Sequence, residues 1–185
     1  WLVSLGLLAA AGGALGAALG GAEVGMALGV SALLGAGLVP VILSRRERSL
    51  GGELLAVTAM SSAGVPVALA AGASPGAAVT AAAVWALGHG ALTVMIRGVI
   101  AHARSLPDAH LALRAVGVLW LFLGATAASV YGGVSCALVG GLVAPCGAAM
   151  ALGVLRPALR RIKVVGWSSM VAGVATLAVL VAALR

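Results

Sequence analysis

The stretch AAVTAAAVWALGHGALTVMI, residues 77–96, runs its whole length without an acidic residue, a lysine or an arginine. A helix of about 20 mostly apolar residues is long enough to cross the hydrocarbon core of a bilayer. Stretches of this kind recur along the chain, which indicates that lipid rather than water surrounds it. The sequence therefore predicts an all-α fold, a polytopic transmembrane helical bundle.

The composition of the whole chain favours the same fold. Of its 185 residues, 63% are hydrophobic and only 8% are charged, whereas soluble domains carry about 25% charged residues. Aromatic residues make up 3%, and there are 28 glycines, which favours helices packed closely through small residues. The net charge of +7 lies in the connections between spans, where membrane topology explains it. We expect the lipid bilayer, and no nucleic acid, as a partner.

Breaks in the apolar pattern divide the chain into about seven spans, which we expect to form a single transmembrane domain over residues 1–185. The least marked boundary is the Gly132-Gly133 pair, because no charge separates the spans on its two sides. One long helix there would give six spans and would move the C-terminus to the opposite face of the membrane. The predicted spans are 1–21, 24–43, 53–71, 77–96, 115–133, 134–154 and 166–184.

The basic residues lie almost entirely on one side of this seven-span arrangement. Three connections, at 44–52, 97–114 and 155–165, hold ten of the eleven basic residues, and Arg185 alone falls on the other side. Basic residues are retained on the cytoplasmic side of a membrane. We therefore predict that these three loops are cytoplasmic and that the chain is a multi-pass membrane protein.

The first candidate ligand-binding residues form a polar stripe, which consists of His89, Thr93 and Arg97. Their spacing of four places them on one face of a helix. At 1.5 Å per residue, His89 would lie about 12 Å below the cytoplasmic end of its span. Polar groups at that depth normally face protein or a water-filled cavity. Two interpretations stay open: the stripe lines a path for a ligand or proton, or His89 bonds a neighbouring helix while Arg97 reaches the surface.

Three further candidate ligand-binding residues lie near the same cytoplasmic end. Glu53 opens the third span, where its charge suits the helix dipole; the alternative is that it pairs with an arginine or binds a cation. His102 and Arg104 belong to a connection that would attract a phosphate or an acidic headgroup, although a solvated basic loop has the same composition. The spacing of His102, Asp108 and His110 is not a recognised metal-ligand pattern. We expect no metal and no cofactor, and no catalytic set establishes an enzyme.

Glycines and prolines within the spans predict how the helices pack. Gly12, Gly16 and Gly20 recur every four residues in the first span, a pattern that permits close helix contact. Prolines inside helices free backbone carbonyls and introduce kinks. We expect such kinks at three positions inside spans: Pro40, Pro66 and Pro145.

Three stretches follow the order and spacing of a known family: RRERSLGGELLAVTAMSSAGVPVALAAG, the span ending MIRGVIAHAR, and RRIKVVGW at the start of the last span. They resemble the YwiC-like bacterial membrane proteins, over roughly residues 38–185. The most specific part is R-x-L-x-x-E/D-L-x-A-V-T-A, which begins at Arg48. The family's opening segment, Pro-Lys/Arg-Glu-His-Gly-Ala-Trp, is absent, so the resemblance implies about two further spans before Trp1. It implies a protein of the bacterial inner membrane without a settled activity. The glycine-rich helix faces and the scarcity of ionisable residues in the spans favour a binder of lipid or quinone, or a subunit of a membrane assembly.

A more distant likeness concerns topology. With two further spans the chain would resemble the UbiA prenyltransferase superfamily, in which acidic motifs in two cytoplasmic loops hold Mg²⁺ and an isoprenoid diphosphate. The second motif would fall on residues 97–108, where Asp108 is the one acidic residue, and a metal–diphosphate site needs clustered oxygen ligands. The alternatives are therefore a transferase acting on an isoprenoid and, third, a small-molecule transporter with sites at helices broken near Pro66 or Pro145.

Overall fold

The computed structural model describes the backbone of residues 2–106, 110–157 and 162–184. Within these ranges every regular element is helical and none is a strand, so the all-α prediction is confirmed. The helices are α1 (Leu2–Leu43), α2 (Leu50–Ser62), α3 (Gly64–Ala70), α4 (Pro75–Ala103), α5 (Leu111–Gly132), α6 (Cys136–Gly140), α7 (Val143–Leu155) and α8 (Ile162–Ala183).

Six segments of the described chain are long and apolar enough to cross a membrane. Large apolar side chains stay exposed along them: Leu33 is 75% exposed, Trp120 69% and Val171 63%. Exposed apolar surface of this extent would be unstable in water and is stable against lipid tails. The chain is therefore a multi-pass membrane protein. The six segments are Ala11–Leu43, Leu50–Ala70, Pro75–Ala103, Leu111–Gly132, Cys136–Leu155 and Lys163–Ala183.

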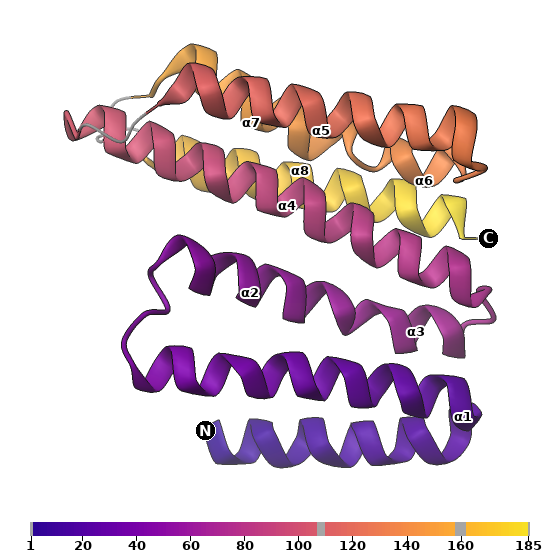
Figure 1. The fold of residues 1–185 in the computed structure, drawn as a ribbon. Helices are drawn as coiled ribbons and strands as arrows, with labels where there is room; N and C mark the ends of the chain where they lie inside the picture. The colour runs from indigo at the N-terminus through magenta and orange to yellow at the C-terminus, as the bar shows by residue number, and fades with distance from the viewer. Residues whose placement is uncertain (1, 107–109, 158–161, 185) are drawn as a thin grey trace. The chain divides into compact units, whose positions relative to one another are not determined.

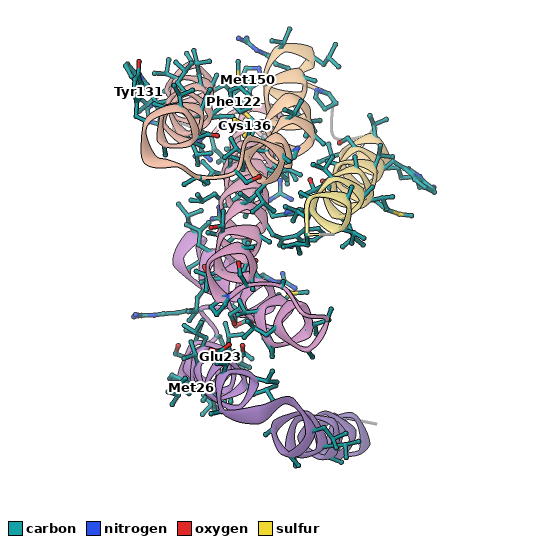
Figure 2. All side chains as sticks on the ribbon, turned by 90° about the vertical axis from the view of Figure 1, so that its right-hand side faces the viewer. Glu23, Met26, Phe122, Tyr131, Cys136 and Met150 are labelled. Atoms are coloured by element: carbon teal, nitrogen blue, oxygen red, sulfur yellow. The ribbon has the colours of Figure 1, made fainter. Side chains whose placement is uncertain are left out.

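The first of these segments folds back on itself. At Gly21 the backbone has φ 74° and ψ −175°, a conformation that essentially only glycine adopts, and the two parts of α1 run antiparallel (Figure 1). Small residues let them approach: a Cβ on Gly16 would lie 3.5 Å from Leu28 Cδ1. Glu23 and Met26 follow directly after the turn (Figure 2) and are exposed. The prediction of about seven spans corresponds to six long apolar helices, of which the first is bent in two.

The chain forms two compact units, Trp1–Ala82 and Ala83–Arg185. In the first unit, α1 packs against both α2 and α3. In the second unit, α7 packs against α5 and α8, and α6 also contacts these two helices. The part of α4 that belongs to the second unit supplies much of its core, and Met95 in that part is fully buried. That all spans form a single domain stays a prediction.

Prolines mark two breaks within predicted spans. The span predicted at 53–71 is divided between α2 and α3, and the span predicted at 134–154 is divided between α6 and α7. In both, proline is the third residue after the break: Pro66 in α3 and Pro145 in α7. Proline is tolerated in a first helical turn because the backbone N–H that it lacks would have no helical partner there. Pro40, in contrast, lies inside α1 without ending it.

The boundary at Gly132-Gly133 separates two helices. Helix α5 ends at Gly132, and Gly133 follows with φ 70°, a left-handed conformation typical of glycine at helix ends. The next helix begins at Cys136. The alternative of one long helix through this region is therefore wrong.

Helix α4 is longer than predicted. Instead of ending near residue 96 it continues to Ala103, and α5 begins at Leu111 rather than 115. Val99 and Ala101 are buried, so the apolar face of α4 continues past Arg97 and keeps the chain helical. The prediction of a polar connection over 97–114 is wrong in its bounds, because Arg97 and Arg114 both lie inside helices.

Candidate functional site

His89 is the middle residue of α4, which has 29 residues. A rise of 1.5 Å per residue places it about 21 Å from either end of the helix. This depth exceeds the 12 Å predicted from Arg97, because the helix extends beyond that arginine. A polar side chain so far from both helix ends is costly in a bilayer and needs hydrogen-bond partners.

The polar stripe satisfies most of its hydrogen bonds within α4 itself. His89 Nδ1 lies 3.0 Å from the backbone oxygen of Trp85, and the Thr93 hydroxyl donates to the backbone oxygen of His89 at 2.8 Å. The imidazole also stacks on the Trp85 indole, with ring centroids 4.3 Å apart and planes inclined by 18°. The partner of His89 is therefore a carbonyl of its own helix, not of a neighbouring helix.

The stripe lies beside the buried face of α4 rather than on it. All three of its residues, His89, Thr93 and Arg97, are half-buried. The buried positions of this part of α4 form the adjacent face: Val84, Gly88, Ala91, Leu92, Met95, Gly98 and Val99. The stripe thus runs along the border between the helical core and the exposed surface.

Helix α8 approaches His89 at a glycine. A Cβ on Gly173 would lie 3.4 Å from His89 Nε2, a distance tight enough that a larger side chain there would press on the imidazole. We call the group formed by Trp85, His89 and Gly173 the His89 site. It brings together a polar ring nitrogen, an aromatic face and a stretch of backbone without a side chain, in the middle of a membrane-spanning helix.

The break between α6 and α7 is closed by packing. Leu142, Pro145 and Thr176 are among the most completely buried side chains. A Cβ on Gly88 would lie only 2.5 Å from Pro145 Cγ, so α4 and α7 pass each other in close contact there. The Thr176 hydroxyl of α8 lies 3.2 Å from the backbone oxygen of Gly141. The break between α6 and α7 is therefore closely packed against α4 and α8.

Arg114 has a structural role that the sequence did not indicate. Its guanidinium donates to the backbone oxygen of Val94 in α4. The Arg114 side chain lies against Gly98, where an added Cβ would come within 2.7 Å of Arg114 Cδ. Arg114 therefore joins α5 to α4 instead of lying in a solvated loop. This contact could not be predicted from the sequence, because Gly98 and Arg114 both fall in the predicted connection 97–114, whereas both lie in helices.

The remaining candidates of α4 lie far from His89. His102 is in the last turn of α4, where a basic group suits the negative end of the helix dipole, and Arg104 follows the helix. Both side chains are exposed. At 1.5 Å per residue His102 is about 20 Å from His89 along the helix. His110 is also exposed, while Asp108 lies outside the described residues.

Two of the basic connections share one end of the second unit. The end of α4, the start of α5, the end of α7 and the start of α8 lie together (Figure 1). The exposed residues Arg104, Arg156 and Lys163 lie at or next to these helix ends. Tyr131 lies near the end of α5 that leads to α6, 90% exposed and pointing outward (Figure 2). The second unit thus has a basic end and an end with an exposed tyrosine.

Glu53 lies in the first turn of α2, in the other unit. Ser49 caps this helix, because its hydroxyl accepts a hydrogen bond from the Gly52 N–H at 3.1 Å. Gly52 is required by close packing, since a Cβ there would lie 2.5 Å from the backbone oxygen of Arg46. Glu53 is half-buried at the positive end of the helix. Its association with Arg97 stays a prediction.

The chain matches no protein-family model, no curated protein and no solved structure. Among the described residues, no three His, Cys, Asp or Glu side chains are arranged to hold a metal ion. The described cysteines, Cys136 and Cys146, are both free thiols; the first is exposed and the second buried.

Proposed function

We propose that this chain is a YwiC-like protein of the bacterial inner membrane that binds a lipid or a quinone at the His89 site. The observation that carries the proposal is a half-buried histidine at the midpoint of α4 with a glycine of α8 against its ring. Polar groups at such depth are rare and are commonly functional. An apolar molecule with a polar group would match both the surrounding lipid and the imidazole.

The proposed orientation places the connections at 44–52, 97–114 and 155–165 in the cytoplasm. It is supported by the shared position of two basic connections at one end of the second unit (Figure 1) and by the tendency of basic residues to stay on the cytoplasmic side. The ligand would then lie near the middle of the membrane, and the exposed His102 and Arg104 would face acidic headgroups.

The two alternatives receive less support from the described residues. A prenyl transferase using a metal-bound diphosphate needs several carboxylates close together, and the described residues provide no such group. A transporter of the broken-helix type needs space at a break, whereas Pro145 is tightly packed. The proposal therefore assigns binding and no chemical reaction, and it is compatible with a role as a subunit of a larger membrane assembly.

The test is to identify what the purified chain carries. The wild-type chain and His89→Leu are extracted in mild detergent, and bound lipids and quinones are measured by mass spectrometry. Circular dichroism checks that both proteins are folded, and Val174→Leu, an exposed change on α8, serves as the control. We expect a defined lipid or quinone with the wild type and the control, at several-fold lower occupancy in His89→Leu. A wild-type protein that carries only bulk phospholipid would contradict the proposal.

A further inference from the structure

We infer that the ligand of the His89 site presents a hydroxyl group, which donates a hydrogen bond to His89 Nε2. The inference rests on the proposed function and narrows it to one class of ligand: an apolar molecule with a free O–H, such as a quinol or an isoprenoid alcohol. The inference follows from which of the two ring nitrogens of His89 carries the proton.

The hydrogen bond to Trp85 fixes the tautomer of His89. The backbone oxygen of Trp85 is an acceptor only, so the ring nitrogen 3.0 Å from it, Nδ1, must carry the proton. A neutral imidazole has one N–H, and its other nitrogen is then an acceptor. In the neutral ring, Nε2 therefore holds a lone pair and needs a donor.

That acceptor has no donor among the described residues. The described hydrogen bond of the imidazole is made through Nδ1. The Thr93 hydroxyl, the closest donor along the stripe, is engaged with the backbone oxygen of His89. Within the described part of the chain, every buried side-chain nitrogen or oxygen has a hydrogen-bond partner. Because Nε2 has no partner there, it is not buried, and a ligand can reach it.

The surroundings of Nε2 suit an apolar ligand with one donor. Gly173 faces the ring nitrogen with backbone alone, and the Trp85 indole covers one face of the imidazole. A quinone or a diphosphate offers oxygens that only accept, so it would oppose one lone pair with another. The backbone of Arg97 is about 12 Å further along the helix.

The experiment compares ligands with and without hydroxyl groups: a quinol has two O–H groups that its quinone lacks, and farnesol has one that its methyl ether lacks. Binding to the detergent-solubilised full chain is measured for decylubiquinol against decylubiquinone, and for farnesol against its methyl ether. We expect the hydroxyl form of at least one pair to bind about tenfold more tightly, as one additional hydrogen bond predicts. The pair that shows the preference distinguishes a quinol from an isoprenoid alcohol as the ligand.

Variants of His89 show whether Nε2 provides the preference. His89→Leu should bind both members of a pair equally, whereas His89→Gln, whose amide oxygen reaches the position of Nε2, should keep part of the preference. His89→Asn, whose amide reaches only the position of Nδ1, should lose it. Because the ligand pairs are compared on the wild-type chain, the test does not depend on these variants folding.

The possible failures have different meanings. Equal binding of both members of each pair by the wild type would overturn the hydroxyl inference and leave the proposed function in place. A preference that persists in His89→Leu would also overturn it, because another group would then recognise the hydroxyl. If none of the four probes binds and the purified chain carries no lipid or quinone, the proposed function itself fails.

Discussion

The hydroxyl of Thr176 lies where a proline has left a backbone carbonyl without its helical partner. Pro145 has no N–H, so the backbone oxygen of Gly141, four residues before it, cannot make the usual helical hydrogen bond. Thr176 is fully buried, and its Oγ1 is within hydrogen-bond distance of that oxygen and of Ala172 O. In lipid an unsatisfied carbonyl is costly, which explains a polar residue in the core of the second unit.

Thr176→Val should therefore destabilise the protein. Valine keeps the shape and removes the hydroxyl, so we expect a loss of about 0.5–2 kcal/mol in the free energy of unfolding. The measurement is denaturant unfolding in mixed micelles, followed by circular dichroism. Thr126→Val is the matched control, because Thr126 is exposed and bonds only within its own helix. Equal losses in the two variants would show that the Gly141 contact contributes nothing.

Gly88 predicts a second effect at the scale of one residue. In Gly88→Ala the new methyl group would collide with the Pro145 ring, 2.5 Å away, and a proline ring cannot rotate aside. We expect about 1–3 kcal/mol of destabilisation from this overpacking. Gly147→Ala is the control: a Cβ there meets nothing within 4 Å, so the change should be neutral or gain up to about 1 kcal/mol of helix propensity. Thermal unfolding of both variants in the same detergent distinguishes the two effects.

At the scale of elements, the α6–α7 break and α8 form one coupled feature. Pro145 leaves the backbone oxygen of Gly141 without a helical donor, and Thr176 lies within hydrogen-bond distance of that oxygen. If residue 145 regains an N–H, this oxygen no longer depends on Thr176. In Pro145→Ala the backbone at 145 can bond Gly141 O directly, so adding Thr176→Val should then cost less than it does in the wild type. We expect a coupling energy of about 0.5–1.5 kcal/mol in a double-mutant cycle. The lost contact between Pro145 and Gly88 is present on both sides of the comparison and cancels.

Additive effects in this cycle would contradict the coupling. The role of Thr176 would then be its packing, or donation of its one hydroxyl proton to the nearer backbone oxygen, that of Ala172 at 2.9 Å. The Thr126→Val change in the Pro145→Ala background serves as the reference, and it should be additive because the two residues lie on different helices and share no contact among those described.

The limits of sequence-based prediction are also clearest at this scale. Apolar length and turn residues placed most span boundaries, since both depend on local chemistry. They failed at α4, where Arg97 looked like the end of a span although the apolar face continues through Val99 and Ala101. The contact of Arg114 with Val94 could not be predicted either. It joins α4 to α5 in a region where the basic residues had suggested a loop.

At the scale of the molecule, the distribution of basic residues predicts a labelling pattern. In a background with both native cysteines replaced by alanine, Arg48→Cys and Arg156→Cys, both at exposed positions, should react with an impermeant thiol reagent only after the cytoplasmic face is opened. In the wild type the exposed Cys136 should react from the opposite face, while the buried Cys146 stays unmodified. Labelling of residues 48 and 156 from opposite faces would contradict the proposed orientation.

Only part of the His89 site could be predicted from the sequence. The helical spacing of His89, Thr93 and Arg97 was visible along the chain. Gly173, which faces the ring from α8, is distant in sequence and belongs to a composition full of similar glycines. No local pattern pairs a given histidine with one glycine among 28, so the approach of Gly173 to Nε2 could be found only in the structure.

The bend at Gly21 has a consequence for biogenesis. Because the chain turns back within one apolar stretch, almost no soluble connector separates the two crossings of α1. The membrane-insertion machinery must therefore place both crossings in the bilayer together. The parity of all later crossings depends on that pairing. A residue that forbids the positive φ of Gly21 would favour one straight rod instead, and every downstream loop, including the arginine-rich ones, would exchange compartments.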